Sequence, residues 1–183
     1  MRVILASASP RRQALLKNIF SEFVIVTTDA DESFLYDSPE ENVINVALNK
    51  AMTVCCNRDD LVISADTTVY MDGKYYGKPL TEENAIAMLR ELSGRRHTVF
   101  TGVCIAYNGK HVTFSEAAAV TFHPLSEEFI SAYVASGSPL DKAGAYGVQD
   151  EGIVAFYEGE YANIMGLPLI RLRKELEGII NGG

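Results

Sequence analysis

The stretch VILASASPRRQALLKNIF, residues 3–20, opens the chain with the pattern of an α/β protein. Its first four residues are apolar and are typical of a short buried strand. Ser9 suits the N-cap of a helix, and Pro10 suits the first helical position. Apolar residues then recur at helical spacing, at Leu15, Leu16, Ile19 and Phe20. The stretch therefore predicts a buried strand, a tight turn and the N-terminus of a helix.

Arg11 and Arg12 stand side by side at this predicted turn. Free N–H groups and the positive end of the helix dipole gather at a helix N-terminus, where they favour an anion. Each guanidinium can also grip a phosphate group through paired hydrogen bonds. The alternative is a capped surface helix with two solvated arginines, and the spacing alone does not separate the two interpretations.

The composition is that of an ordinary globular protein and restricts the classes of function. The 183 residues are 48% hydrophobic and 22% charged, which fits a single domain over residues 1–183, with or without a small second lobe. A formal net charge of -8 disfavours a diffuse nucleic-acid binder. Three cysteines form no CxxC pair, and we interpret them as reduced thiols: Cys55, Cys56 and Cys104. No segment approaches the roughly 18 apolar residues of a membrane span, and no signal peptide is evident, so we expect a cytoplasmic protein without a membrane partner.

Further along the chain, helices and strands alternate first and hairpins follow. Strands are predicted at 23–28, 61–71, on both sides of Asn108-Gly109 within 97–123, at 153–157 and at 161–165. Helices are predicted behind Ser38-Pro39, Thr81 and Ser126, and from Pro168. The dipeptides Asp72-Gly73 and Asn108-Gly109 signal hairpin turns. The pattern predicts an α/β fold with a mixed sheet.

Two acidic residues are candidates for metal or acid–base chemistry. Asp66 lies in an otherwise apolar strand, where a carboxylate is costly unless it is paired, bound to a metal or at the strand end. It is either a strand-end residue that caps a turn, or a metal ligand or general base. Glu32 lies in an acidic loop with Asp29 and Asp31, and such loops are often merely solvated. Its alternative use is as a second carboxylate for Mg²⁺, which prefers a few carboxylates together with water and phosphate oxygens.

Other polar residues stand where they can reach a ligand. Lys50 falls close to the buried stripe of its helix, so it reaches either the protein edge or a site. Lys78 is held in the turn 77–79, GKP, which aims its side chain. Gln149 ends the glycine-rich segment 141–149, which is either a connection or a loop closing over a ligand, with the amide reading a base. The histidines are far apart, and we interpret them as structural or surface residues: His97, His111 and His123.

Together these residues resemble the Maf family of nucleoside triphosphate pyrophosphatases. The segments that carry the resemblance follow the family order over nearly the whole chain: LASASPRRQALL (5–16), Glu32 in DADES, NKA (49–51), SADTTV (64–69), GKP (77–79), MLRELSG (88–94), DKAGAYGVQ (141–149) and MGLPL (165–169). Each segment alone is a weak signal, and their combination is specific.

The resemblance implies a fold of the Maf and inosine-triphosphatase type, with a mixed elongated sheet flanked by helices, two lobes around a central cleft, and often a homodimer. It implies hydrolysis of dTTP and UTP, or of modified pyrimidine nucleotides, to the monophosphate and pyrophosphate with a divalent metal, Mg²⁺ or Mn²⁺. It makes Asp66 the catalytic acid–base residue. The family branch that acts on dTTP and UTP has arginine, threonine and glutamine at the positions of Arg11, Thr67 and Gln149, which set substrate choice.

The residue patterns and the family resemblance point to the same candidate site. The expected catalytic residues are Asp66, Lys50 and Lys78; the expected substrate-binding residues are Ser9, Arg11, Arg12, Thr67 and Gln149; the expected metal ligands are Glu32 and Asp66. In the expected reaction the metal bridges phosphate oxygens while Asp66 activates a water that attacks the α-phosphorus. The rival hypothesis is a nucleotide-binding regulator of septum formation with little turnover.

One position departs from the family pattern. Family members commonly have glycine after the loop glutamine, and here Asp150-Glu151 follow. The departure predicts a different loop conformation, or an additional negative charge near the phosphates that weakens binding.

Overall fold

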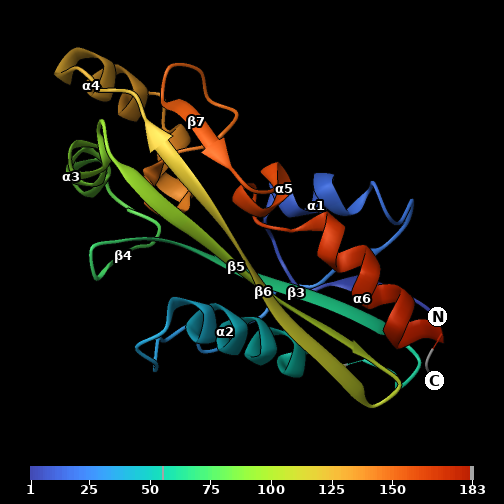
Figure 1. Ribbon diagram of the computed structural model, residues 1–183. Coiled ribbons are helices and arrows are strands. Elements are labelled where there is room, and N and C mark those ends of the chain that lie inside the picture. Colours follow the sequence, from blue (N-terminus) through green and yellow to red (C-terminus); the bar gives the residue numbers. More distant parts are fainter. Residues whose placement is uncertain (55, 182–183) are drawn as a thin grey trace. The chain divides into compact units, whose positions relative to one another are not determined.

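The computed structural model describes residues 1–54 and 56–181, which form two compact units (Figure 1). Unit 1 comprises Met1–Thr67, Thr101–Glu116 and Ala162–Gly183, and unit 2 comprises Thr68–Phe100 and Ala117–Tyr161. The expectation for Cys55 lies outside the described residues. Cys104 is a buried free thiol, and burial raises its pKa to about 12.

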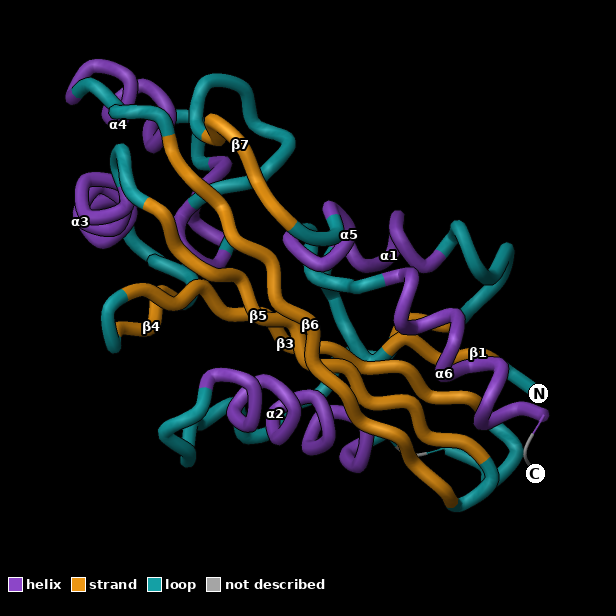
Figure 2. The backbone as a smooth tube through the Cα atoms, viewed as in Figure 1, coloured by secondary structure: helices purple, strands orange, loops and turns teal. Residues whose placement is uncertain are grey.

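The strands form a mixed sheet, as the sequence predicts (Figure 2). Within the described residues the strand order is β2-β1-β3-β5-β6-β7, and β4 pairs with β3. The strands are β1 (Val3–Leu5), β2 (Val24–Ile25), β3 (Leu61–Met71), β4 (Lys74–Tyr76), β5 (Arg96–Tyr107), β6 (Lys110–Phe122) and β7 (Val154–Glu158). β1 lies parallel to β2 on one side and to β3 on the other, whereas the β3–β4 and β6–β7 pairs are antiparallel. The prediction of an α/β fold with a mixed sheet is therefore confirmed.

Helices cover both faces of the sheet in unit 1 (Figure 1). The helices are α1 (Pro10–Leu16), α2 (Pro39–Thr53), the short α5 (Tyr161–Ile164), most of which belongs to this unit, and α6 (Leu169–Asn181). Val3 and Leu5 of β1 face a core that contains side chains of α1 and α6. Ile4 and Ala6 face a second core that contains side chains of α2. Successive strand residues point to opposite faces, so a strand covered on both faces has to be apolar throughout.

Helix α2 approaches β5 so closely that only glycine fits at residue 102. A Cβ atom built on Gly102 would lie 2.3 Å from the carbonyl carbon of Val43 and 2.4 Å from its oxygen, both in the α2 backbone. The Ser64 hydroxyl of β3 donates a hydrogen bond to the Ala47 carbonyl at 2.6 Å and holds the same helix. These contacts fix the position of Lys50, about one helical turn beyond Ala47.

Unit 2 packs α3 (Glu82–Leu92) against α4 (Glu127–Ala135), next to two short 3₁₀ turns, η1 (Ser138–Asp141) and η2 (Ala143–Ala145). The predicted caps are confirmed, because the side chains of Thr81 and Ser126 accept hydrogen bonds from backbone N–H groups of the first turns. No helix within the described residues combines the length and the apolar character that crossing a bilayer requires.

The rings of His97, Phe122 and Tyr146 meet edge to face in the core of unit 2. His97 Nε2 lies 2.8 Å from the Tyr146 hydroxyl oxygen, and burial lowers the pKa of His97 to about 4. The ring is therefore neutral near pH 7, and His97 is a structural residue, as the sequence predicts.

Both predicted hairpin turns are confirmed. Asp72 and Gly73 have φ values of 52° and 81°, and Asn108 and Gly109 have values of 52° and 77°. Positive φ at both central residues is the geometry of a type I′ turn, which matches the twist of the flanking strands.

Three local predictions need correction. The strand expected at 23–28 is only Val24–Ile25. The segment 161–165 is not a strand, because the N–H groups of Gly166 and Leu167 return to carbonyls within it at 3.0 and 2.9 Å and Tyr161–Ile164 forms α5. Periodicity cannot separate helix from strand in so short an apolar run. Ser9 occupies the N-cap of α1, but its side chain makes no capping hydrogen bond.

Candidate functional site

The candidate site lies where β1 ends and β3 continues. β2 and β3 flank β1 on opposite sides, and the connecting helices α1 and α2 lie on opposite faces of the sheet. Ligands in open α/β sheets bind at such a switch point, outside the carboxyl ends of the strands. The parallel pairing of β3 with β1 runs to Ile63 opposite Leu5, so Asp66 and Thr67 extend past the end of β1.

Asp66 and Thr67 point to opposite faces of β3, because successive residues alternate along a strand. Asp66 meets Lys50 of α2, and Thr67 meets Arg12 of α1. The end of β1 is therefore flanked by two polar groups, one on each face of the sheet.

On the α2 face, Lys50 lies between two carboxylates. Its Nζ is 2.8 Å from Asp66 Oδ1 and 3.0 Å from Glu32 Oε1. Asp66 and Lys50 are buried, with 9% and 8% exposure, whereas the Glu32 side chain is 59% exposed. Lys50 thus points inward onto Asp66, and removing Lys50 would leave Asp66 as an uncompensated buried charge, whereas Lys50 also has the Glu32 carboxylate as a partner.

On the α1 face, the Arg12 guanidinium is held on several sides. Its Nε donates to the Gly166 carbonyl at 2.9 Å, and its terminal nitrogens donate to Ser7 Oγ at 3.2 Å and to Thr67 Oγ1 at 3.0 Å. Burial lowers the pKa of Arg12, while the nearby Asp66 carboxylate opposes that shift. The guanidinium remains charged at neutral pH, and its orientation is fixed.

Thr67 belongs to a chain of hydrogen bonds with a defined direction. The Thr101 hydroxyl donates its proton to the Asn163 carbonyl at 2.9 Å. Thr67 Oγ1 lies 3.1 Å from Thr101 Oγ1, so the proton between these two oxygens belongs to Thr67. Sequence reasoning missed Thr101 and Asn163, and the available signal was a hydroxyl in the apolar strand β5.

We expect Thr101→Val to destabilise the protein by about 1–3 kcal/mol, because it leaves the Thr67 hydroxyl proton without its acceptor and removes one of the hydrogen bonds to the Asn163 carbonyl. Valine has nearly the shape of threonine, so the loss reflects the hydroxyl rather than a cavity. The free energy of unfolding in urea measures the effect. Thr101→Ser, which keeps the hydroxyl, is the control, and equal stability of the valine variant and the parent would contradict the assignment.

Ser9 and Arg11 lie at the start of α1, next to Arg12. The Ser9 N–H donates to Ser7 Oγ at 3.3 Å, the same oxygen that receives Arg12. Arg11 is half-buried, and its charge adds to burial in lowering the pKa of Arg12. Unit 1 therefore brings seven of the predicted site residues to the end of β1: Ser9, Arg11, Arg12, Glu32, Lys50, Asp66 and Thr67.

The other two predicted residues, Lys78 and Gln149, belong to unit 2. Lys78 is exposed on the turn after β4, where the Gly77 carbonyl accepts a hydrogen bond from the Gly144 N–H at 3.1 Å. Gln149 is exposed on the turn 147–150. Within unit 2 the Lys78 turn is thus bonded to the glycine-rich segment that also carries Gln149.

Two carboxylates are available for a cation at the end of β1. Among residues 1–54 and 56–181, no group of three or more His, Cys, Asp or Glu side chains is arranged to hold a metal. Glu32 and Asp66 nevertheless contact one ammonium group, so a single cation can lie between them. Mg²⁺ accepts a small set of protein ligands when water and phosphate oxygens complete its coordination. The donor set therefore fits a divalent metal that binds together with a phosphate substrate.

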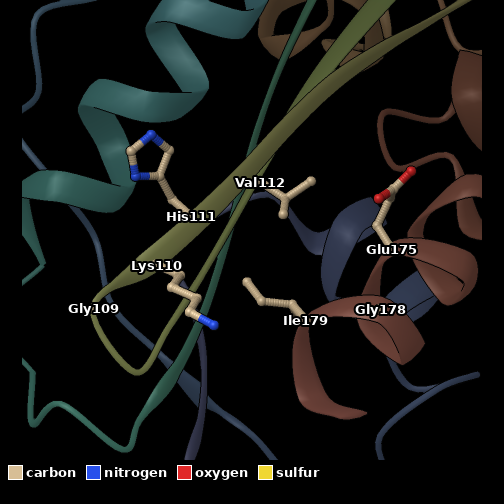
Figure 3. A pocket seen from close by; sticks show the side chains of 7 residues that line it. All are labelled: Gly109, Lys110, His111, Val112, Glu175, Gly178 and Ile179. Atoms are coloured by element: carbon tan, nitrogen blue, oxygen red, sulfur yellow. The ribbon is translucent and has the colours of Figure 1, made fainter. Parts of the chain in front are cut away.

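A separate hollow of unit 1 lies beside the β5–β6 hairpin and α6 (Figure 3). Its lining contains none of the predicted site residues and consists of Gly109, Lys110, His111, Val112, Glu175, Gly178 and Ile179. The Glu175 carboxylate accepts a hydrogen bond from Arg171 of the same helix at 2.5 Å. The hollow is thus distinct from the polar groups at the end of β1.

The chain is similar over nearly its whole length to proteins of one family. The sequence profile of the family described as Maf-like protein matches residues 2–179. A dTTP/UTP pyrophosphatase of Bacillus cereus (strain AH187) is 45% identical over 180 residues, which cover 96% of this chain and 94% of the relative. A dTTP/UTP pyrophosphatase of Bacillus thuringiensis subsp. konkukian (strain 97-27) is 46% identical with the same coverage of 96% and 94%.

A solved structure, a HAM1 protein from Coxiella burnetii, matches with a TM-score of 0.51 at 14% identity and covers 100% of both chains. At that identity the likeness concerns the fold alone, and it agrees with the mixed α/β architecture. The family profile and the curated relatives cover almost every residue from β1 to α6. The chain belongs to the Maf family.

Proposed function

We propose that this protein hydrolyses dTTP and UTP to the nucleoside monophosphate and pyrophosphate. The observation that carries the proposal is the buried Asp66–Lys50 pair, joined by Glu32 and next to the fixed Arg12 guanidinium at the end of β1. A triphosphate requires concentrated positive charge, and a metal requires carboxylates. Relatives at 45% and 46% identity named dTTP/UTP pyrophosphatase support this choice among phosphate chemistries.

The proposed roles follow from the chemistry of each side chain. Asp66, Lys50 and Lys78 are the catalytic residues; Ser9, Arg11, Arg12, Thr67 and Gln149 bind substrate. Glu32 and Asp66 would hold a divalent metal, Mg²⁺ or Mn²⁺. When bound, the metal supplies positive charge to the phosphate oxygens.

In the proposed mechanism Asp66 accepts the proton of the water that attacks the α-phosphorus. Lys50 holds the Asp66 carboxylate in one orientation through the 2.8 Å contact. Arg11 and Arg12 donate hydrogen bonds to the leaving pyrophosphate, on which negative charge gathers. Preorganised donors of this kind typically lower a barrier by about 3–4 kcal/mol each.

The proposal also covers the domain organisation, the location, the kind of substrate and the assembly of the protein. Residues 1–183 act as one Maf-like domain in the cytoplasm, and the substrate is a free nucleotide rather than a nucleic acid or a membrane. The net charge of -8 supports a free nucleotide, because a diffuse nucleic-acid binder is usually basic. A homodimer is the proposed assembly, and sedimentation analysis measures it.

Pyrophosphate release from dTTP, UTP, CTP and dATP, with Mg²⁺ or Mn²⁺ and with a chelator, tests the function. We expect the highest kcat/KM for dTTP or UTP and no turnover with the chelator. Including 5-methyl-UTP and pseudo-UTP shows whether a modified nucleotide is preferred. Tight binding of dTTP without release of pyrophosphate would reject the enzyme and favour the nucleotide-binding regulator.

A further inference from the structure

Asp150 directs one carboxylate oxygen towards a group of hydrogen-bond donors in unit 2. Its Oδ2 accepts from the Tyr133 hydroxyl at 2.5 Å and from the Gly147 N–H at 3.2 Å, and the Ser138 hydroxyl lies 3.5 Å away. Burial, and then the bond to Asp150, raise the pKa of Tyr133, so this hydroxyl remains a donor at neutral pH. The additional negative charge expected at residue 150 is thus compensated by donors of its own unit.

Asp150 also closes the turn that carries Gln149. The Asp150 N–H donates to the Gly147 carbonyl at 3.0 Å, while the Gly147 N–H donates back to the Asp150 carboxylate. Gly147 is therefore bonded to Asp150 through both of its backbone groups. A Cβ atom built on Gly147 would lie 2.6 Å from Gln149 Nε2, so the Gln149 amide lies directly over this glycine.

The closed turn is tied to two further elements of unit 2. Tyr133 belongs to α4, and its hydroxyl also accepts from the Gly147 N–H at 3.3 Å. Ser138 opens η1 and is held by Lys142, whose buried ammonium donates to the Ser138 hydroxyl at 3.0 Å and to its carbonyl. The position of residues 147–150 is therefore set by α4 and η1 through the Asp150 carboxylate.

We propose that Asp150 is a positioning residue for nucleobase recognition: anchored by Tyr133, its carboxylate closes the turn 147–150 and holds the Gln149 amide in one place. The inference rests on the proposed function in so far as Gln149 contacts the base. Ordering the turn that carries a recognition group before binding removes part of an entropic cost that binding would otherwise bear. Loss of the Asp150 carboxylate therefore weakens base-dependent binding and leaves phosphate binding intact.

A purely structural role of Asp150 would give different results. If Asp150 only stabilised unit 2, its loss would weaken every ligand that this unit contacts and would lower the melting temperature. Pyrophosphate carries the phosphate groups without a base, so it separates the two roles.

The experiment compares Asp150→Asn and Tyr133→Phe with Glu151→Gln, which makes the same loss of charge at the exposed neighbouring carboxylate. Titration calorimetry measures the Kd of the α,β-imido analogue of dTTP and the Kd of pyrophosphate. Amide hydrogen exchange at Gly147, followed by NMR, reports how often the turn opens, and this measurement does not depend on activity.

We expect Asp150→Asn to raise the Kd of the dTTP analogue about tenfold and to leave the Kd of pyrophosphate within about twofold. Exchange at Gly147 becomes faster in Asp150→Asn and in Tyr133→Phe, and Glu151→Gln matches the parent in each measurement. Because Tyr133 and Asp150 act as one unit, the double variant binds no more weakly than Asp150→Asn alone.

An unchanged Kd for the analogue in Asp150→Asn would overturn the inference, and so would an equal loss for the analogue and pyrophosphate. A parent protein that binds dTTP without cleaving it rejects the proposed function, while the Kd comparison still decides the role of Asp150. A parent that binds neither ligand rejects both.

Discussion

Asp66→Asn is expected to lower kcat for dTTP by about 10³-fold, within the range of general acid–base catalysis. Asparagine has the shape of aspartate but cannot take a proton from water at neutral pH. It is also a poorer ligand for a divalent metal, since one of the two proposed carboxylates is lost. Pyrophosphate release under saturating dTTP measures the change.

The same substitution is expected to leave the fold intact. Lys50 keeps Glu32 at 3.0 Å, so its ammonium is not left without a carboxylate. Asp60→Asn is the matched control, because Asp60 is also buried in unit 1 and pairs with Arg2 at 2.6 Å away from the site. A folded Asp66→Asn protein with the parental kcat, or an equal loss in Asp60→Asn, would remove Asp66 from the mechanism.

Gly102→Ala is expected to destabilise the protein by about 3 kcal/mol or more, the upper range for overpacking a core. The new methyl group would meet backbone atoms of Val43 at 2.3 and 2.4 Å, and a helix backbone cannot move aside as a side chain can. Helix α2 would have to shift away from β5, and Lys50 would move with it. The free energy of unfolding in urea and the kcat for dTTP should therefore fall together.

Gly178→Ala is the control for Gly102→Ala, and its expected effect has the opposite sign. Gly178 lies within α6 with no heavy atom within 4 Å of an added Cβ. Alanine there should stabilise the helix by about 0.5–1 kcal/mol, because glycine loses more backbone entropy. If the two variants were equally stable, the close approach of α2 to β5 would not be the cause.

The parts of the fold that local chemistry determines were predictable from the sequence. The apolar run of β1 and the two hairpin dipeptides specify their conformations within a few residues. The extent of β2 and the helical conformation of α5 were not predictable, because β2 has two residues and α5 has four, too few for any period to emerge. Tertiary contacts decide the conformation of these segments, and the local sequence pattern does not reveal those contacts.

The residues of the candidate site were likewise only partly predictable from the sequence. Asp66 stood out because an isolated charge in an apolar strand has a high cost. Glu32 and Gln149 were open candidates from their loops, and the resemblance to a family favoured the functional interpretation of both. Thr101 did not stand out, because a hydroxyl in a strand carries no comparable penalty in the sequence. Its importance comes from the Asn163 carbonyl, 62 residues away along the chain and 2.9 Å away in space.

The hydrogen bonds around Thr67 also restrict what a ligand can offer to that residue. The hydroxyl proton of Thr67 is committed to Thr101, and one lone pair of the oxygen is taken by Arg12. What remains is acceptor capacity, so a group that approaches this oxygen has to bring its own hydrogen. The imide N–H of uracil or thymine satisfies that condition, whereas the bare ring nitrogen of cytosine does not. A main-chain carbonyl two hydrogen bonds away thereby sets the polarity of this position.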